Sequence, residues 1–337
     1  MKKTLLTICL VWMCFSLSAQ KIIDLSGKWS FSIDRQDNGE KEKWFSHTLN
    51  DFINLPGSMP EKLKGDEVTA KTQWTGSLYD SSYYYNPYME KYRKEGNIKF
   101  PFFLTPDKHY VGAAWYQKEV NIPADWKGER ILLFLERPHI ETTVWVNGQK
   151  TGMQNSLCVP HQYDITRYVR PGKCTITIRV DNRIKEINVG PDSHSITDQT
   201  QGNWNGIVGR ICLQTTPKTY FDDIQIYPEP EQKLARVKVV IKGTGTAKVK
   251  LSAESFNTDK KHIVPAIQQE IKLNKGVTET EMVLPMGNDM LLWDEFHPAL
   301  YKLKAEVTNG KKTEIKEIQF GMRRFEIKGK WFYVNGR

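Results

Sequence analysis

The chain has 337 residues, a length that corresponds to about two domains at roughly 150 residues per domain. With 39% apolar and 26% charged residues, its composition excludes a fibrous or an intrinsically disordered chain. Lys and Arg exceed Asp and Glu by 48 to 39, and aromatic residues make up 11%, including ten tryptophans.

Residues 1–19 have the pattern of a secretory signal peptide. Two lysines precede an apolar run from Leu5 to Leu17, and a small-residue exit follows at Ala19. The run is shorter than the ~20 residues that span a bilayer, so export is favoured over a membrane anchor. Cys14 follows a bulky methionine, which disfavours lipid attachment there. We therefore expect an exported chain, periplasmic or extracellular, with no membrane span.

Removal of residues 1–19 leaves three cysteines, Cys158, Cys174 and Cys212. An odd number excludes a complete disulfide framework, although one bridge stays open. None has the C-x-x-C spacing of a zinc or redox site, so buried thiols are favoured and no metal or cofactor is expected. The 46 remaining basic residues, against 39 acidic ones, give +7 and occur in scattered pairs such as Lys260-Lys261. Nucleic acid is therefore not an expected partner.

Alternation of apolar and polar residues with a period of two dominates the first two hundred residues. Short strands are expected at Trp29–Ile33, Ile131–Leu135 and Thr175–Val180. Val144–Val146 leads directly into Asn147-Gly148, a dipeptide that supplies the positive φ angles of a tight hairpin turn. No run of twelve or more residues carries a helical stripe. The pattern predicts a β-sandwich.

A second series of strands follows a connector at Gln214–Lys218. The expected strands contain Ile224 and Ile226, Arg236–Ile241, Ala247–Ala253, Ile271–Leu273, Glu281–Leu284, Tyr301–Val307 and Glu314–Phe320. About seven strands in about 100 residues are typical of an immunoglobulin-like sandwich.

The last residues, 321–337, contain two short strand-like stretches, and the second ends in the turn signal Asn335-Gly336. A compact domain rarely stops inside a hairpin. The front portion of a longer protein is therefore favoured over a frayed tail.

Six motifs occur in a fixed order along the chain. They are G-A-A-W-Y-Q-K-E-V-N-I-P (112–123), V-W-V-N-G (144–148), Y-D-I-T (163–166), R-V-D-N (179–182), W-N-G-I-V-G-R (204–210) and L-W (292–293) with P-A-L-Y (298–301). Together they resemble the motifs of glycoside hydrolase family 2, the family of β-galactosidases, β-glucuronidases and β-mannosidases. The fifth motif departs from the family's W-x-G-I-x-R by one extra residue before the Arg.

The resemblance implies an all-β chain whose domains follow the family's order. It implies a jelly-roll, galactose-binding-like β-sandwich over 20–218 and an immunoglobulin-like β-sandwich over 219–320. F-G-M-R (320–323) and V-N-G (334–336) resemble the start of the catalytic (β/α)₈ barrel, which implies a truncated barrel start over 321–337 with the rest of the barrel missing.

The function that the resemblance implies is that of an exported, exo-acting β-glycosidase, β-galactosidase-like, that hydrolyses terminal β-linked sugars. Its partners would be a carbohydrate and its own barrel, against which the sandwiches pack; a homo-oligomer stays open, as does the sugar cleaved. The alternative is a free-standing, non-catalytic carbohydrate-binding module.

No catalytic residue is assigned within the chain. Retaining glycosidases use two carboxyl groups ~5 Å apart, and in this family both are barrel glutamates, one of them in an Asn-Glu pair. The chain contains no Asn-Glu pair. Adjacent acids at Asp222-Asp223 and Asp294-Glu295 would point to opposite faces of a strand. Asp192-Ser193-His194 lacks a nucleophile-elbow motif and cannot form a relay between consecutive residues.

The polar loop before the fifth motif has the best claim to a substrate contact. In the family, the equivalent loop reaches the active-site pocket of the barrel and helps to hold the terminal sugar. The resemblance therefore implies Asp198, Asn203, Trp204 and Asn205 as candidate substrate-binding residues. The family's acid just ahead of the Trp is not matched cleanly, since Asp198 lies six residues before it. His109 is a further candidate, with a turn histidine as the alternative.

Residues 79–110 contain ten aromatic residues in 32 positions, against 11% overall. Sugar rings present apolar C–H faces that stack on aromatic rings, so a saccharide contact is one interpretation. An insertion packed across the sandwich is the other. Trp115, Tyr116 and Trp145, on expected strands, are assigned to the sandwich core.

Overall fold

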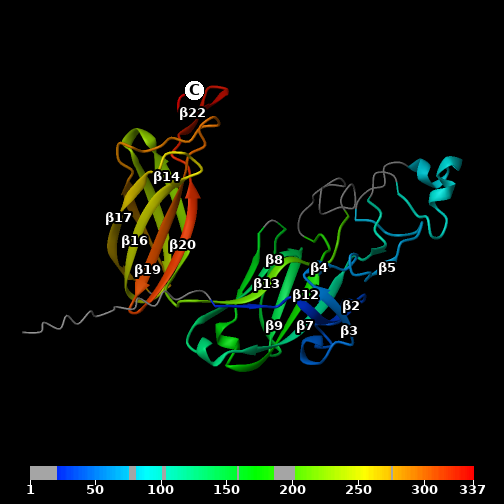
Figure 1. Ribbon diagram of the computed structural model, residues 1–337. Coiled ribbons are helices and arrows are strands. Elements are labelled where there is room, and N and C mark those ends of the chain that lie inside the picture. Colours follow the sequence, from blue (N-terminus) through cyan, green and yellow to red (C-terminus); the bar gives the residue numbers. More distant parts are fainter. Residues whose placement is uncertain (1–20, 76–80, 101–103, 158, 186–201, 275) are drawn as a thin grey trace, which may run out of the picture. The chain divides into compact units, whose positions relative to one another are not determined.

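The structure, a computed structural model, describes residues 21–75, 81–100, 104–157, 159–185, 202–274 and 276–337 (Figure 1). Residues 21–215 and residues 216–337 form two compact units. In the described residues, each unit contains two larger antiparallel β-sheets and one two-stranded sheet, which confirms the all-β prediction of two successive β-sandwiches. The helices in the described residues are short 3₁₀ turns: η1 (Trp44–Ser46), η2 (Ser81–Tyr84), η3 (Pro87–Tyr92), η4 (Ala124–Trp126), η5 (Thr166–Tyr168) and η6 (Pro230–Gln232).

The first unit is a sandwich of a six-stranded and a five-stranded sheet. The larger sheet has the order β10 (Gln149–Asn155), β9 (Glu141–Val146), β12 (Gly172–Asp181), β7 (Ala113–Ile122), β2 (Gly27–Asp34) and β3 (Asp51–Leu55). The smaller has the order β1 (Ile22–Asp24), β13 (Gly206–Thr216), β8 (Arg130–His139) and β11 (His161–Asp164), with β4 (Gly57–Ser58) paired to β13. Outside both sheets, β5 (Asp66–Glu67) pairs with β6 (Lys108–His109).

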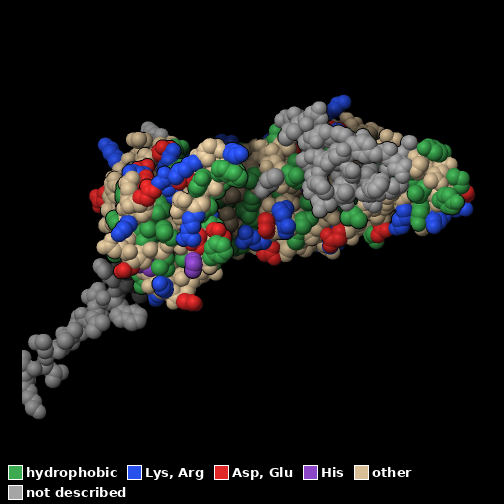
Figure 2. Space-filling view, turned by 90° about the horizontal axis from the view of Figure 1, so that it is seen from above, with side chains coloured by type: hydrophobic (Ala, Val, Ile, Leu, Met, Phe, Trp, Pro, Cys, Tyr) green, Lys and Arg blue, Asp and Glu red, His purple; other side chains and the backbone are tan. Residues whose placement is uncertain are grey.

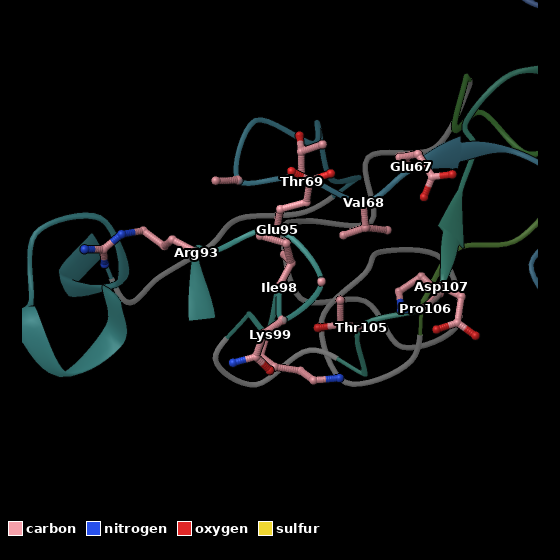
Figure 3. A pocket seen from close by; sticks show the side chains of 13 residues that line it. Glu67, Val68, Thr69, Arg93, Glu95, Ile98, Lys99, Thr105, Pro106 and Asp107 are labelled. Atoms are coloured by element: carbon pink, nitrogen blue, oxygen red, sulfur yellow. The ribbon is translucent and has the colours of Figure 1, made fainter. Parts of the chain in front are cut away.

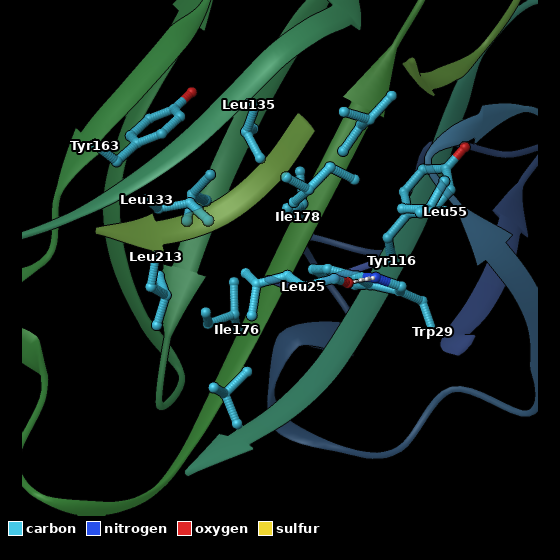
Figure 4. Close-up of a cluster of buried hydrophobic side chains, with 14 of the residues drawn as sticks. Leu25, Trp29, Leu55, Tyr116, Leu133, Leu135, Tyr163, Ile176, Ile178 and Leu213 are labelled. Carbon is cyan, nitrogen blue, oxygen red and sulfur yellow. Dashed lines mark hydrogen bonds between the residues drawn. The ribbon is translucent and has the colours of Figure 1, made fainter. Parts of the chain in front are cut away.

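The main core of this unit lies between its two sheets. Leu133 from β8 and Leu213 from β13 pack toward Ile176 and Ile178 from β12, and all four are fully buried (Figure 4). Tyr116 belongs to the same cluster. The period-two pattern therefore places its apolar residues on the inward face, as the sequence predicts.

A second aromatic cluster covers the outer face of the six-stranded sheet. Trp115 and Trp145 are 0% and 2% exposed, and their ring centroids lie 4.9 Å apart. Phe45, in η1, stacks on Trp145 with ring centroids 5.2 Å apart. The prediction that Trp115, Tyr116 and Trp145 are core residues is confirmed. Because neighbours on β7 point to opposite faces, Trp115 and Tyr116 enter two different clusters.

Local sequence signals explain the turns and the thiols. Asn147 and Gly148 both have positive φ, 51° and 75°, as the hairpin turn between β9 and β10 requires. Cys174 and Cys212 are buried free thiols, as expected, and burial raises the pKa of Cys174 to about 11. Cys158 lies outside the described residues.

The expected connector at Gln214–Lys218 is shorter than predicted. β13 continues to Thr216 because it pairs with β1, with Gln214 opposite Ile22, and β14 begins at Tyr220. The polar residues of this stretch are therefore part of a strand, and only residues 217–219 connect the two units.

The second unit has seven strands in two sheets. One sheet has the order β14 (Tyr220–Glu229), β15 (Leu234–Lys242) and β18 (Val277–Pro285); the other has β17 (Ile263–Leu273), β16 (Gly245–Phe256), β19 (Leu300–Asn309) and β20 (Lys312–Phe320). Every second residue of β15 and β19 is buried, which fits the predicted immunoglobulin-like sandwich. A hairpin of β21 (Phe325–Lys328) and β22 (Trp331–Val334) follows. On the face shown in Figure 2, acidic and basic side chains are interspersed over this unit.

No helix among the residues that the structure describes is long and apolar enough to cross a membrane.

Leu133→Ala should lower the free energy of unfolding of the first unit by about 2–5 kcal/mol, because it leaves a cavity where a fully buried side chain stood. Urea unfolding followed by tryptophan fluorescence measures this, since Trp29, Trp44, Trp74, Trp115, Trp126, Trp145 and Trp204 all belong to this unit. The matched control is Leu104→Ala in the same unit, at a side chain that is 72% exposed. Equal destabilisation by both substitutions would contradict the assigned core.

Candidate functional site

The candidate residues Asn203, Trp204 and Asn205 come directly before β13, at one end of the first sandwich. Asp198 lies outside the described residues. The two asparagines are buried, at 3% and 1% exposure, whereas Trp204 between them is partly exposed. The three neighbouring side chains therefore have different environments and must be considered separately.

Both side-chain polar atoms of Asn205 and its backbone carbonyl are hydrogen-bonded to protein groups. Its Nδ2 donates to the carbonyl oxygens of Gly112 and Val180 at 2.9 and 3.0 Å, and its Oδ1 accepts from the Tyr116 hydroxyl at 2.7 Å. Its own carbonyl accepts from the amide of Met59 at 2.7 Å. Burial raises the pKa of Tyr116 well above its usual value, which keeps this hydroxyl protonated as a donor. Asn205 thus fixes the start of β13 to β7 and β12.

Asn203 is held by Asn182, the residue that follows β12. Asn182 Nδ2 donates to Asn203 Oδ1 at 3.0 Å, and Asn203 Nδ2 donates to the Asn182 carbonyl at 3.0 Å. Asn182 also accepts from the amide of Gly112 and donates to the carbonyl of Tyr110, both at 2.8 Å. We call Asn182, Asn203 and Asn205 the asparagine cluster. It joins the segment before β7, the end of β12 and the start of β13.

Trp204 packs against His139, the last residue of β8. The ring centroids are 4.5 Å apart with an interplanar angle of 34°, and His139 is fully buried. The peptide bond between His139 and Ile140 is cis. One side of the indole is therefore supported by protein, while part of its surface stays open to solvent. A supported, partly open indole has the geometry of a stacking surface for an apolar ring face.

A network of charges lies beside the asparagine cluster. Asp181, which is fully buried, accepts from Arg179 at 3.0 Å, Arg183 at 2.5 Å and Lys185 at 2.9 Å. Arg179 and Arg183 also each bond to Asp37 at 2.6 Å. Burial alone would raise the pKa of Asp181, but hydrogen bonds from Arg183 and Lys185 outweigh it and hold the pKa well below its usual range. Asp181 therefore stays ionised, next to Asn182 in the chain.

His109 is a buried residue in a different place. It is the last residue of β6, is 6% exposed, and its ring centroid lies 4.6 Å from that of Trp74. The backbone carbonyl of its neighbour Tyr110 accepts a hydrogen bond from Asn182 Nδ2, which links the His109 segment to the asparagine cluster. The structure thus sets His109 against Trp74, whereas Trp204 packs on His139.

The sequence did not point to Asn182, Asp181 or His139 as site residues. The R-V-D-N motif at 179–182 contained two of them, but nothing in its spacing showed that the Asn182 side chain bonds to two other segments, before β7 and before β13. His139 gave no signal, because its contact with Trp204 joins residues 65 positions apart.

Among the acids considered at the sequence level, Asp222, Asp223 and Glu295 are exposed, and Asp192 lies outside the described residues. Asp294 Oδ1 accepts from the amides of Phe296 and His297 at 2.9 and 2.7 Å, which closes a turn. Within the described ranges, no group of three or more His, Cys, Asp or Glu residues could hold a metal ion.

Two family profiles match the chain in succession. One, described as "Glycosyl hydrolases family 2, sugar binding domain", matches residues 22–217, and one described as "Glycosyl hydrolases family 2" matches residues 219–323. The first profile alone covers more than half of the chain.

Curated relatives are similar along most of the chain. A β-glucuronidase of Paenibacillus borealis is 24% identical over 94% of this chain and 48% of its own length. A β-galactosidase large subunit of Latilactobacillus sakei is 24% identical over 93% of this chain and 48% of its own. A putative β-glucuronidase of Formosa agariphila is 29% identical over 69% of this chain. The chain spans about half the length of the first two.

Among solved structures, a crystal structure of Ruminococcus gnavus β-glucuronidase superposes with a TM-score of 0.62 at 19% identity. The match covers 95% of this chain and 48% of the other. It supports the fold assigned to both units.

Asn182→Ala should lower the free energy of unfolding of the first unit by about 2–4 kcal/mol, because the Gly112 amide and the Tyr110 carbonyl lose their side-chain partner in a buried place. Urea unfolding measures the loss. Asn54→Ala, at an exposed position of β3, is the matched control and should change little. A neutral effect of Asn182→Ala would contradict the role of the asparagine cluster.

Asp181→Asn should destabilise the first unit by about 3–5 kcal/mol at pH 7, because three basic side chains lose a buried carboxylate. The pKa of Asp181 is lower in the folded than in the unfolded chain. Its stabilisation is therefore fully present above about pH 4 and declines as the pH falls further. The difference in the free energy of unfolding between wild type and Asp181→Asn should stay constant from pH 8 to 5 and become smaller below pH 4.

The matched control for that measurement is Asp125→Asn, which breaks an exposed pair with Lys21 and should have little effect. If the difference in the free energy of unfolding between wild type and Asp181→Asn increased as the pH falls, a stabilising Asp181 carboxylate would be contradicted.

Proposed function

The chain belongs to glycoside hydrolase family 2, and on that basis we propose that it is the N-terminal portion of an exported, exo-acting β-glycosidase. The whole protein would hydrolyse terminal β-linked sugars of glycans. Support comes from the two consecutive family profiles and from relatives whose own length is about twice that of the chain. The basic, apolar and small-residue pattern of residues 1–19 supports export.

The proposal places the hydrolytic chemistry outside these 337 residues. A retaining glycosidase needs an acid/base and a nucleophile, both carboxyl groups, held ~5 Å apart. The chain has no Asn-Glu pair, and its adjacent acids do not form such a site. Residues 321–337 would be the first part of a barrel that carries both glutamates. By itself the chain would not hydrolyse glycosides.

The single observation that carries a sugar-binding role for this chain is the position of Trp204. It is partly exposed, backed by the His139 ring at 4.5 Å, and flanked by two asparagines whose side chains are committed to protein partners. We infer that Trp204 contacts the apolar face of the sugar, while Asn203 and Asn205 position it. Asp198 and His109 stay candidates for polar contacts in the complete protein.

The sugar is proposed to be a β-galactoside, and the similarity to a β-galactosidase large subunit supports this choice. A β-glucuronide is the second candidate, because two of the relatives and the superposed structure are named β-glucuronidase or putative β-glucuronidase. The excess of Lys and Arg suits the approach of an acidic glycan, although a diffuse charge does not set specificity.

Trp204→Ala in the polypeptide of the complete reading frame should raise the KM for the preferred aryl β-glycoside about tenfold, a loss of ~1.4 kcal/mol of binding. Its kcat should change little, because a stacking contact binds substrate and transition state alike. Steady-state hydrolysis of aryl β-galactoside, β-glucuronide and β-mannoside provides both constants.

Trp204→Phe is the matched variant and should recover most of the lost affinity, since it keeps an aromatic face. The melting temperature of Trp204→Ala should stay near that of the wild type. If it collapses instead, Trp204 is a core residue and the proposed sugar contact is wrong. A reading frame that stops at Arg337, in a chain that binds glycans, would favour the free-standing carbohydrate-binding module.

A further inference from the structure

A pocket of about 480 Å³ lies in the segment between β4 and β7 (Figure 3), and its described lining includes no residue of the asparagine cluster. Residues from three stretches of this segment line it: residues 67–70, residues 93 and 95–99, and residues 105–107. Its volume falls within the ~300–1,000 Å³ that is usual for small-ligand sites. The role proposed for Trp204 does not account for it, because Trp204 is not among the lining residues that the structure describes.

The pocket is fixed from outside by buried aromatic residues. Tyr83 and Phe100 are 0% and 4% exposed, and their ring centroids are 4.7 Å apart. Trp74 packs edge-on against Phe100 at 4.8 Å. These contacts hold the stretches that line the pocket, so it is formed before any ligand arrives. In its described residues, the aromatic-rich segment thus has a small core of its own. Tyr79, Phe102 and Phe103 lie outside the described residues.

Backbone contacts close the wall further. The amide of Lys99 donates to the carbonyl of Tyr92 at 3.1 Å, and Asn97 Nδ2 donates to the carbonyl of Lys91 at 2.8 Å. The Thr105 hydroxyl accepts from the Phe100 amide at 3.2 Å. The stretches at 93–99 and 105–107 are therefore held in place by the residues around them.

The charged groups at the pocket are available to a ligand. Within the described part of the chain, no hydrogen bond or ion pair engages the head groups of Glu95, Lys99 or Asp107. Arg93 points away from the pocket, toward η2 and η3, and donates to the carbonyls of Tyr83 and Asn86 (Figure 3). The pocket thus offers two carboxylate acceptors and one ammonium donor.

Apolar groups complete the lining. Val68, Ile98 and Pro106 are half-buried and give the pocket surfaces without hydrogen-bonding side chains. A ligand with hydroxyl groups on its edge and C–H groups on its face matches this combination. A strongly anionic ligand does not, because the free carboxylates outnumber the free ammonium group.

Exposed tyrosines lie on η2, on η3 and in the turn between them. Tyr84, Tyr85 and Tyr88 are 54%, 73% and 86% exposed, and hydrophobic side chains are visible at the tip of the insertion in Figure 2. Arg93 connects them to the pocket, since it lines the pocket and bonds to the carbonyl of Tyr83. Clustered exposed aromatic residues mark interaction surfaces more often than inert ones.

We propose that the insertion pocket is a second saccharide-binding site, separate from that of Trp204, and that it holds a neutral, hydroxyl-rich sugar unit of a glycan chain. The carboxylates of Glu95 and Asp107 accept from sugar hydroxyls, Lys99 donates to them, and the apolar lining contacts the ring face. The inference rests on the proposed function only for the class of ligand, and its test needs no hydrolysis.

Isothermal titration calorimetry of the 337-residue chain provides the test, with galactotetraose, cellotetraose and mannotetraose as neutral probes and tetragalacturonate as the acidic one. We expect binding of at least one neutral probe. The double variant Lys99→Ala/Asp107→Ala should weaken it at least tenfold. Ala70→Phe, which fills the pocket, should abolish it. Lys94→Ala, a charge change on an exposed residue outside the lining of the pocket, is the matched control and should bind as the wild type does.

The proposal is overturned if no neutral probe binds, if only tetragalacturonate binds, or if binding is lost in Trp204→Ala and kept in both pocket variants. Thermal melting of each variant shows whether its fold is retained. Ala70→Phe and the double variant change different parts of the lining, so the test can rest on one of them if the other does not fold. Hydrolysis of aryl glycosides by the complete polypeptide tests the proposed function separately, since it can fail while the pocket binds.

Discussion

The candidate site depends on buried side-chain amides that are hydrogen-bonded to other protein groups: to each other, to the backbone, and to the hydroxyls of Tyr116 and Thr75. Asn182, Asn203 and Asn205 tie the segment before β7, the end of β12 and the start of β13 into one unit. Each amide left unpaired in this place would cost about 1–3 kcal/mol. The need to pair these amides fixes the backbone position of residues 203–205, and therefore the position of Trp204 against His139.

The charge network beside the cluster has a related role. Asp181 is fully buried and shared by three basic side chains, and it precedes Asn182 directly. Buried ion pairs contribute little net stability, but losing one member is expensive. The network therefore specifies one arrangement of the end of β12. Through its bonds to Asn203, Asn182 then links the end of β12 to the segment that contains Trp204, the candidate sugar-contacting residue.

Much of the fold could be predicted from the sequence, and the site only in part. Period-two patterns located most strands, and Asn147-Gly148 identified its turn, because both signals are local. The polar residues before Pro217 were misassigned because pairing with β1, almost two hundred residues away, makes them a strand. The hydrogen-bond partners of Asn203 and Asn205, such as Asn182 and Tyr116, are also distant in sequence, so the sequence did not predict these bonds. The contact of both asparagines with substrate stays a prediction.

The central claim is that this chain is the sugar-binding front part of a family 2 glycosidase whose catalytic carboxylates lie elsewhere. The most direct test compares aryl β-glycoside hydrolysis by the 337-residue chain and by the polypeptide of the complete reading frame. The account predicts no hydrolysis by the chain and turnover of a β-galactoside or β-glucuronide by the complete polypeptide. Turnover by the 337-residue chain alone, or by neither protein, would contradict it.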